Sequence, residues 1–312
     1  MKILVIQQKM IGDVLTSSIL FKHLRVAYPL ATLDYLINSH TSAVVEHNPY
    51  IDHLILFSEK EESSTIALLK FAKQITNKGV EKIRFCATSA TRDATNRAIF
   101  IDGVRKILGV EVEVIPGDEE AKLSYIGATK ELQQSDAPFL VVDIGGGSTE
   151  FVYGDKNVIA AKSVNIGCVR MSERHLNTQP PTMAQVAQAI VDIDIAITQA
   201  AAVVPITQAK TLVAVAGTAT TVAAAALELD KYDRHLIHLS RISAQSVHKV
   251  AGLFQSMNKQ ELAAIGYMHP GRVDVITAGA LVLSRVMAAT GASEFVASES
   301  DILDGIAWSL AK

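Results

Sequence analysis

The sequence predicts an α/β protein whose sheet is largely parallel, and three observations carry that prediction. Short apolar runs alternate with segments of helical spacing over residues 1–135, which is the pattern of strand–helix–strand units. From about residue 136 the pattern changes to strand–turn–strand in the stretch FLVVDIGGGSTEFVYG. Hydrophobic residues make up 49% of the 312 residues and charged residues 20%, which suffices for a buried core in two ordinary domains.

Composition and charge limit the kinds of molecule that the protein is expected to bind. The formal net charge is −3, so the chain has no general electrostatic attraction for nucleic acid, and any polyanion must meet a local basic pocket. The two cysteines, Cys86 and Cys168, form neither a metal-ligand pattern nor a disulfide framework. The N-terminal apolar run is too short for a signal peptide, and no run reaches the length of a membrane span. We therefore expect a cytoplasmic protein with no nucleic-acid and no membrane partner.

The first half of the chain is expected to alternate strands and helices. Residues 1–58 read as strand, helix, strand and strand, in the stretches KILVIQ, DVLTSSILFKHLRVAY, TLDYLI and HLILF. The polar stretch SEKEESS that follows is a candidate seam. Beyond it we expect a helix over about 63–78 ended by Gly79, a strand in KIRFCATSA, a helix closed by Gly109, a strand in VEVEVI and a helix in EEAKLSYIGATKEL.

The second half is expected to begin with a hairpin and to continue mainly with helices. FLVVDIGGGSTEFVYG reads as strand, turn and strand. A helix follows PPT, with Thr182 as its N-cap and Met183 on its apolar face. TLVAVAGTATTVAAAALEL reads as strand, glycine turn and helix. Further helices are expected over about 243–256, 259–266, 274–290 and 301–311.

The run Gly145–Gly147 after a buried-looking strand admits several interpretations. A dinucleotide fingerprint requires a helix after G-x-G-x-x-G, but TEFVYG reads as a strand, and a P-loop requires a Gly-Lys-Ser/Thr sequence that is absent. The remaining interpretations are a tight hairpin without ligand and a hairpin whose backbone N–H groups bind phosphate. Glycine assists the second by allowing positive φ and close approach of a ligand. We favour the phosphate hairpin, with Asp143 holding a metal ion or its water, and Ser148 and Thr149 adding hydroxyl donors.

Two strand-to-helix junctions are further candidates for phosphate binding. In ATSATRDATN, Arg92 falls in the first turn of the expected helix, where a cation opposes the helix dipole. A phosphate contact therefore explains Arg92 better than helix stability does, with Thr88 and Ser89 expected as caps. In VAVAGTATT, Gly217 and Thr218 either bind phosphate at the helix N-terminus or form a tight turn with a threonine cap.

Together these stretches resemble the Ppx/GppA family of exopolyphosphatases and guanosine-pentaphosphate phosphohydrolases. DIGGGSTE, ATSATR and GDEEA carry the resemblance, which extends in order over about 60–312. It implies two actin-like ATPase (ribonuclease H-like) domains with a ligand cleft between them, a homodimer, and Glu120 as the catalytic base. In the matching segments NIGCVRMSE and MHPGRVDV, Arg170 and Arg272 are candidate polyanion contacts, and Asp274 is expected as an N-cap.

The N-terminal segment departs from that family. The family's first phosphate loop, Asp-x-Gly-Ser/Thr-Asn-Ser, is missing, and residues 1–58 instead resemble the start of the lipopolysaccharide heptosyltransferases. The aspartate of that second family that matches Asp13 is a candidate catalytic base, but we prefer the interpretation that Asp13 caps its helix. We therefore predict a heptosyltransferase-like, Rossmann-like βαβ segment over 1–58, the remainder of the first actin-like domain over 59–135, and the second actin-like domain over 136–312.

The predicted reaction is hydrolysis of the terminal phosphoanhydride of inorganic polyphosphate, with Mg²⁺ or another divalent cation as cofactor. Glu120 is the predicted base, Asp143 organises the metal or the attacking water, and both carboxylates are predicted metal ligands. The predicted phosphate-binding residues are Ser89, Arg92, Gly145, Gly146, Gly147, Ser148, Gly217 and Thr218. Removal of the 5′-phosphate of guanosine pentaphosphate is the alternative reaction. Because the first phosphate loop is missing, a non-catalytic binder of polyphosphate or nucleotide and a scaffold without ligand are further alternatives.

Overall fold

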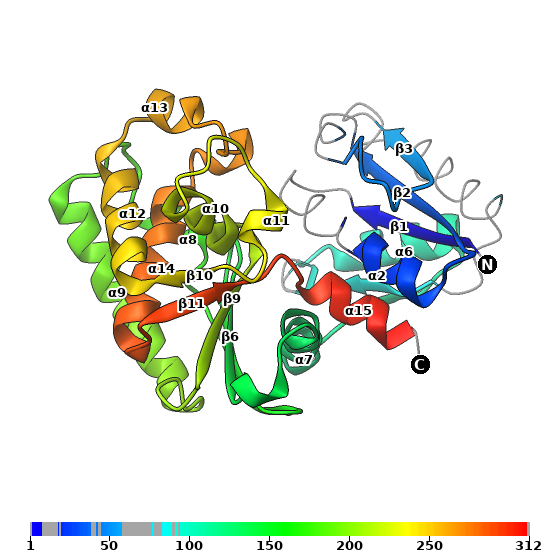
Figure 1. Ribbon diagram of the computed structural model, residues 1–312, viewed down its shortest axis with the longest axis horizontal. Coiled ribbons are helices and arrows are strands. Elements are labelled where there is room, and N and C mark those ends of the chain that lie inside the picture. Colours follow the sequence, from blue (N-terminus) through cyan, green and yellow to red (C-terminus); the bar gives the residue numbers. More distant parts are fainter. Residues whose placement is uncertain are drawn as a thin grey trace. The chain divides into compact units, whose positions relative to one another are not determined.

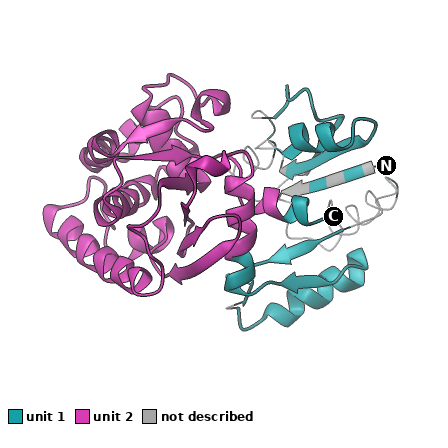
Figure 2. Cartoon of the chain, turned by 60° about the horizontal axis from the view of Figure 1, so that its bottom comes forward, with its two compact units in different colours: residues 1–120, 306–312 teal, residues 121–305 magenta. Residues whose placement is uncertain are grey.

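The computed structural model describes residues 2–7, 18, 20–38, 42, 45–57, 77, 83–88, 91–92 and 94–310. The chain divides into two compact units. Unit 1 comprises residues 1–120 and 306–312, and unit 2 comprises residues 121–305 (Figure 2). Apart from residue 77, the predicted helix over 63–78 lies outside the described residues, as do Gly79 and Asp13. The domain limits predicted at residues 58 and 135 stay predictions.

The first part of unit 1 is a parallel three-stranded sheet in the order β1–β2–β3 (Figure 1). Its strands are β1 (Lys2–Gln7), β2 (Thr32–Asn38) and β3 (His53–Phe57), and α2 (Leu20–Ala27) lies between β1 and β2 in the chain. Leu33, Tyr35 and Ile37 of β2 are fully buried together with Phe21 of α2, whose ring lies 4.8 Å from that of Tyr35. The element order predicted for residues 1–58 is confirmed for the described residues.

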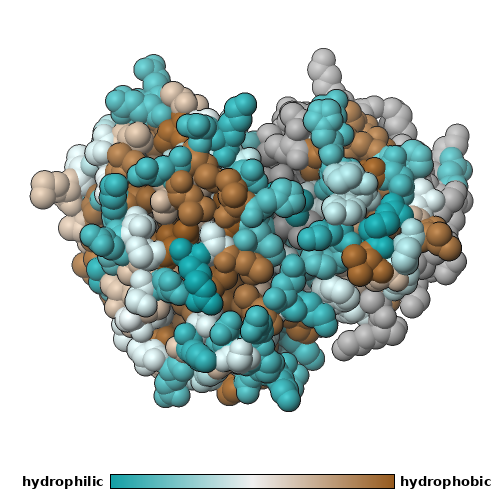
Figure 3. Space-filling model, viewed as in Figure 1, coloured by the Kyte–Doolittle hydropathy of each residue, from teal (hydrophilic) through white to brown (hydrophobic). Residues whose placement is uncertain are grey.

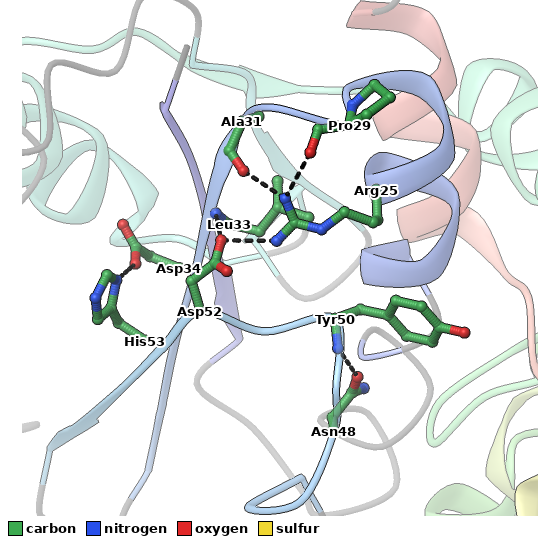
Figure 4. A network of polar contacts seen from close by, with 9 residues as sticks. All are labelled: Arg25, Pro29, Ala31, Leu33, Asp34, Asn48, Tyr50, Asp52 and His53. Carbon is green, nitrogen blue, oxygen red and sulfur yellow. Dashed lines mark hydrogen bonds and ion pairs between the residues drawn. The ribbon is translucent and has the colours of Figure 1, made fainter.

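Polar contacts fix the connection that follows α2 (Figure 4). The Arg25 guanidinium donates hydrogen bonds to the carbonyl oxygens of Pro29 (3.3 Å) and Ala31 (2.6 Å) and forms an ion pair with Asp52 (2.7 Å). Asp52 also accepts a hydrogen bond from the backbone N–H of Leu33 (2.6 Å). That bond and the Arg25 cation lower the pKa of the Asp52 carboxyl. The contacts therefore join the end of α2 to β2 and to the residue before β3.

The second part of unit 1 contains two parallel strands, β4 (Phe85–Ala87) and β5 (Val112–Val114), with α6 (Arg97–Leu108) between them in the chain. Gly109 ends α6 with a φ of 66°, in the left-handed region that glycine enters without strain. The predicted closure at Gly109 is confirmed, although α6 begins later than the start predicted near residue 91. The helix α7 (Gly117–Thr129) begins in unit 1 and continues into unit 2.

Unit 2 is built on a six-stranded mixed sheet in the order β10–β11–β9–β6–β7–β8. The strands are β6 (Phe139–Ile144), β7 (Thr149–Gly154), β8 (Val158–Val164), β9 (Thr211–Val215), β10 (Arg241–Ser243) and β11 (Glu294–Ala297). β6, β9 and β11 run parallel to one another, whereas β7, β8 and β10 pair antiparallel with their neighbours. The antiparallel β6–β7 pair is the strand–turn–strand predicted around the glycine run.

Helices cover both faces of this sheet (Figure 1). The larger core lies between one face, which presents Leu140 and Val142 of β6, and a layer of helices. That layer contains α8 (Cys168–Arg174), α9 (Met183–Ala201), α10 (Ala216–Ala226), α12 (Ala244–Ser256) and α14 (Ile276–Thr290). The smaller core joins Val141 on the opposite face to Tyr125 of α7. The remaining helices are α11 (Arg234–Ile237), α13 (Lys259–Ala264), α15 (Ile302–Leu310) and the short 3₁₀ turns η2 (Gln134–Asp136) and η3 (Pro270–Arg272).

The ends of these helices test three predictions. Thr182 is the N-cap of α9 and forms a capping box with Gln185, as predicted for the cap. Met183, predicted on the apolar face, is 91% exposed, because the buried side chains of α9 begin only at Ala189, beyond its first turn. The N-cap prediction for Asp274 is also wrong, since Asp274 pairs with Lys259 (2.6 Å) and the residue before α14 is Val275.

The described helices were compared with the length and apolarity of a membrane span, and the surface shows where apolar side chains gather. No helix in the described part of the chain is long and apolar enough to cross a membrane. Figure 3 shows apolar side chains gathered on the visible face of unit 2 over the region of α8 and α10, with hydrophilic side chains around them. The N-termini of these two helices lie at the candidate site.

Candidate phosphate-binding site

The glycine run forms the turn of the β6–β7 hairpin and packs on the start of α8. The backbone N–H of Gly145 donates to the carbonyl oxygen of Ser148 (3.0 Å) across the turn. The carbonyl oxygens of Gly145 and Gly146 accept hydrogen bonds of 2.9–3.0 Å from the first N–H groups of α8. Within the described chain, the N–H groups of Gly146, Gly147 and Ser148 donate to no backbone acceptor. These three N–H groups are therefore available to an anion.

Close neighbours, rather than positive φ, distinguish the glycine positions of this turn. Among the described glycines, only Gly109 and Gly291 have positive φ, so the run does not use the conformational freedom that glycine allows. A Cβ added to Gly145, Gly146 or Gly147 would lie 3.2–3.4 Å from Ser148, Val169 or Arg170. At Gly167, just before α8, a Cβ would lie 2.2 Å from the carbonyl oxygen of Gly146. The absence of side chains therefore lets the turn and α8 approach closely.

Arg170 brings a positive charge to the turn. Its Nε donates a hydrogen bond to the carbonyl oxygen of Gly147 (2.6 Å). The bond holds the guanidinium beside the N–H groups that are available to an anion. The structure thus places Arg170, a candidate polyanion contact, at the predicted phosphate hairpin.

The Gly217 turn lies at the same edge of the sheet as the hairpin. β6 and β9 are parallel, and Asp143 pairs with Val215, so both strands end there. Ligands of α/β proteins commonly bind at the carboxyl ends of parallel strands. Ala216, between β9 and the body of α10, has a φ of 64°, which strains a residue with a side chain. The turn predicted from the glycine is therefore made by its alanine neighbour.

Gly217 instead leaves room for the side chain of Arg272. A Cβ on Gly217 would lie 1.4–1.7 Å from the Nη1, Nη2 and Cζ atoms of Arg272, so the guanidinium packs directly against the glycine Cα. The carbonyl oxygen of Gly217 accepts a hydrogen bond from the Thr221 hydroxyl (2.7 Å). The structure therefore joins Arg272, which follows Gly217 at a long distance in the sequence, to the predicted glycine turn.

Thr218 lies where three helices begin. A Cβ on Gly279, in the first turns of α14, would lie 2.6 Å from the Thr218 hydroxyl oxygen and 3.2 Å from Cβ of Cys168, the first residue of α8. The Thr218 hydroxyl also hydrogen-bonds to the Cys168 thiol, whose pKa is raised by burial. The starts of α10 and α14 thus meet near the two arginines, and helix N-termini attract anions.

Two carboxylates stand side by side on the hairpin. Asp143 on β6 and Glu150 on β7 are directly opposite in the antiparallel ladder, so their side chains share one face. Ser124 donates to Asp143 (3.2 Å), and the hydroxyls of Ser148 and Ser163 donate to Oε1 of Glu150 (2.7 and 2.6 Å). Glu150 was not among the site residues predicted from the sequence, although the four-residue turn fixes the register that places it opposite Asp143.

This acidic pair fits a magnesium ion. Mg²⁺ usually binds one or two protein carboxylates and completes its shell with water and substrate phosphate oxygens. Among the described residues, no group of three or more His, Cys, Asp or Glu side chains could hold a metal, so a site made only of protein ligands is not present there. Asp143 and Glu150 are therefore the residues of unit 2 that would hold the ion. The predicted role of Glu120 as a metal ligand stays a prediction.

In unit 1, Glu120 is paired with Arg92. Nη1 of Arg92 donates to Oε2 of Glu120 (3.2 Å) and to the carbonyl oxygen of Ile115 (2.8 Å). Burial raises the pKa of the Glu120 carboxyl, and hydrogen bonds from Arg92 and Thr88 partly offset the rise. The structure therefore joins two of the predicted site residues, while Ser89 lies outside the described residues. The phosphate contact predicted for Arg92 stays a prediction.

The fold and the residues at this sheet edge define a phosphate-handling protein of the actin-like ATPase class. The model of the Ppx/GppA phosphatase family matches residues 48–312. The chain therefore belongs to the Ppx/GppA phosphatase family. The family match starts at residue 48, and the heptosyltransferase resemblance of residues 1–58 stays a prediction.

Individual relatives agree with this assignment. Exopolyphosphatase 2 from Mycobacterium tuberculosis is 42% identical over 254 residues, which cover 78% of this chain and 80% of that protein. Guanosine-5′-triphosphate,3′-diphosphate pyrophosphatase from Photobacterium profundum is 42% identical over 106 residues, which cover 34% of this chain and 21% of that protein. A solved structure of an exopolyphosphatase-like protein, 42% identical, superposes with a TM-score of 0.75 over 80% of this chain and 84% of its own. The Ppx/GppA enzyme of Aquifex aeolicus, 26% identical, gives a TM-score of 0.70 over 80% and 82%. The predicted actin-like two-domain fold is thereby confirmed.

Proposed function

We propose that this protein hydrolyses the terminal phosphoanhydride bond of inorganic polyphosphate and releases phosphate. The observation that carries the proposal is the glycine hairpin, whose available N–H groups at Gly146, Gly147 and Ser148 lie beside the Arg170 guanidinium. Preorganised N–H donors and arginines match the terminal phosphate of a polyanion. The Mycobacterium tuberculosis relative, named an exopolyphosphatase, supports polyphosphate as the substrate.

Glu120 acts in the proposed reaction as the general base. It accepts a proton from a water molecule whose oxygen forms a bond to the terminal phosphorus, while the bond from that phosphorus to the bridging oxygen breaks. The bridging oxygen keeps the electron pair and becomes the new chain end. Burial brings the pKa of Glu120 closer to neutral pH, which suits a base that must both take up and release a proton.

Asp143 and Glu150 are the proposed holders of Mg²⁺. When bound, the ion would neutralise part of the negative charge of the substrate phosphates. The hydroxyl donors at Ser124, Ser148 and Ser163 orient the two carboxylates, so the pair is prepared for the ion before it arrives.

The decisive experiment measures phosphate release from long-chain polyphosphate by the full-length protein in the presence of Mg²⁺. Glu120→Gln removes the base and is expected to lower the rate by roughly 10²–10⁴-fold. Glu119→Gln is the matched control, because Glu119 precedes Glu120 in α7 and pairs with Arg84 (2.5 Å). Release that survives Glu120→Gln would contradict the proposed base, and no release from the folded native protein would contradict the proposed activity.

Guanosine pentaphosphate is the second candidate substrate, and the Photobacterium relative named for a guanosine polyphosphate supports it. The ratio of kcat/KM for the two substrates decides between them. Since the sequence lacks the first phosphate loop of the family, a binder without turnover remains the third candidate. Such a protein would gain thermal stability from polyphosphate and release no phosphate. The homodimer and the cytoplasmic location expected from the sequence stay predictions.

A further inference from the structure

A row of polar side chains crosses three strands beside the glycine turn. Glu150 on β7 lies opposite Asp143 on β6 and, on its other side, opposite Ser163 on β8, the outer strand of the sheet. Side chains at paired positions of a sheet share one face. The next row of that face is apolar and lies in the smaller core: Val141, Val152 and Ala161. The two carboxylates therefore lie between an apolar core and the turn, with the Ser163 hydroxyl at the outer end of their row.

Two hydroxyl groups saturate one oxygen of Glu150. A carboxylate oxygen has two lone-pair sites that can accept hydrogen bonds. Oε1 of Glu150 accepts one hydrogen bond from Ser148 (2.7 Å) and another from Ser163 (2.6 Å). Glu150 is only 8% exposed, so water poorly replaces a bond that is lost. A cation that contacted both oxygens of Glu150 would therefore have to break one of these hydrogen bonds.

Mg²⁺ and Ca²⁺ differ in how they use a carboxylate. Mg²⁺ requires near-octahedral geometry, keeps several water ligands and is bound through one or two protein carboxylates. Ca²⁺ takes about six to eight oxygen ligands and accepts both oxygens of one carboxylate. A glutamate whose Oε1 is saturated by hydroxyl donors therefore suits Mg²⁺ and deprives Ca²⁺ of a two-oxygen contact.

We propose that Ser163 is a positioning residue that makes the Asp143–Glu150 site selective for Mg²⁺ over Ca²⁺. Together with Ser148, it keeps Oε1 of Glu150 out of contact with the ion. This selectivity rests on the Mg²⁺ site of the proposed function but not on the hydrolysis of polyphosphate. Loss of a hydrogen-bond partner of a metal-binding side chain weakens metal affinity by about 10–100-fold. Ser163→Ala is therefore expected to weaken Mg²⁺ binding about tenfold, whereas the vacated site on Oε1 leaves Ca²⁺ binding unchanged or tighter.

The test measures the Tm of the full-length protein, without substrate, as a function of MgCl₂ or CaCl₂ concentration, which gives a Kd for each ion. Ser163→Ala is expected to lower the ratio of the Ca²⁺ Kd to the Mg²⁺ Kd by about tenfold or more. Ser163→Thr keeps the hydroxyl and is expected to retain the native ratio. Ser256→Ala is the matched control, because Ser256 is an exposed serine at the end of α12 whose hydroxyl donates to the carbonyl oxygen of Leu253 (2.8 Å).

The ratio separates positioning from a general effect on stability. If Ser163 served only the fold, Ser163→Ala would lower the Tm without cation and would leave the ratio of the two Kd values native. A native ratio in Ser163→Ala would therefore overturn the inference, as would a native protein whose Tm does not respond to Mg²⁺. A protein that shows the expected ratios but releases no phosphate from polyphosphate would contradict the proposed activity and leave the inference standing.

Discussion

Two glycines at the candidate site differ in what occupies the position of a side chain. At Gly167 a Cβ would lie 2.2 Å from a backbone carbonyl oxygen of the hairpin. At Gly217 it would lie 1.4 Å from a guanidinium nitrogen of Arg272, which is the end of a flexible side chain. Neither glycine has positive φ. The missing side chain therefore allows close packing of backbone at Gly167, whereas at Gly217 it makes room for the guanidinium of Arg272.

Alanine at these two positions is expected to have opposite consequences. Gly167→Ala forces the backbone of α8 or the hairpin to move and is expected to lower the free energy of unfolding by about 1–3 kcal/mol. Gly217→Ala is expected to leave stability close to native, because Arg272 can swing away, but to weaken polyphosphate binding. Thermal unfolding and KM measure the two effects. A loss of stability in Gly217→Ala as large as that in Gly167→Ala would contradict this assignment.

The ion pair of Arg92 and Glu120 predicts how activity depends on pH. A general base works in its deprotonated form, so activity falls when the pH drops through the raised pKa of Glu120. Arg92→Met removes a cation that lowers this pKa and is expected to move the acidic limb of the kcat/KM profile to higher pH. Arg92→Lys keeps the charge and is expected to leave the limb nearer its native position. An acidic limb at the same pH in both variants would show that the Arg92 charge does not tune the base.

At the scale of elements, the β6–β7 hairpin determines which carboxylates meet. The turn Gly145–Ser148 sets the register that places Asp143 opposite Glu150. Like charges directly opposite on antiparallel strands destabilise the pair, and a bound cation relieves the repulsion. The hairpin therefore links metal binding to the stability of unit 2.

Mg²⁺ is expected to raise the Tm of the native protein, and Asp143→Asn and Glu150→Gln are each expected to remove most of that rise. Without Mg²⁺, Asp143→Asn is expected to match or exceed native stability, by up to about 1 kcal/mol, because it removes the repulsion. Glu173→Gln, at an exposed position of α8, is the control. A native Tm that does not respond to Mg²⁺ would rule out the metal site on the hairpin.

Local sequence patterns predicted these elements well, but they did not predict contacts between residues far apart in the chain. The strand that carries Asp143, the cap at Thr182 and the closure at Gly109 depend on neighbouring residues only, so each was predictable. The contact of Arg272 with Gly217 joins η3 to the start of α10, two segments far apart in the chain, and no local pattern encodes it. The burial of Glu299 beside Tyr232 has the same origin, since the strand order of the sheet brings them together.

At the scale of the whole molecule, buried acids set the pH dependence of stability. Burial and the nearby Glu131 raise the pKa of Asp304 from 3.8 to about 7. Between these values the native state binds more protons than the unfolded chain, so this group destabilises the fold as the pH rises from about 4 to about 7. Asp192 has the opposite effect on stability as the pH rises. Burial raises its pKa, but hydrogen bonds from His175 and Arg174 outweigh burial and lower it.

Asp304→Asn keeps an acceptor for the backbone N–H of Asp301 (2.9 Å) and removes the charge. Its Tm relative to the native protein is therefore expected to increase as the pH rises from about 4 to about 7. Asp192→Asn is the opposite control, expected to be less stable than native at neutral pH, with a difference that shrinks in acid. Thermal unfolding across this pH range measures both, and parallel curves for native and Asp304→Asn would contradict the raised pKa.

The α/β class and the change of pattern near residue 136 were predictable, because the spacing of apolar residues differs between strands and helices and can be seen in each segment. The attachment of the last residues to unit 1 was not predictable. The pattern over 301–311 predicts a helix but does not show which part of the protein that helix packs against. The structure shows that part. Trp308 lies with its ring 6.0 Å from that of His23, and the Ser309 hydroxyl accepts a hydrogen bond from Arg84 (2.8 Å).

This attachment has a consequence for the newly made chain. Unit 1 is interrupted, since residues 306–312 complete it only after the whole of residues 121–305. At a synthesis rate of about 5–20 residues per second, the ribosome needs on the order of ten seconds or more to make the intervening unit. Unit 2 is continuous in the chain and can fold as it emerges. The first 120 residues pass through that interval without Trp308 and Ser309, so unit 1 can complete its packing only after unit 2 has been made.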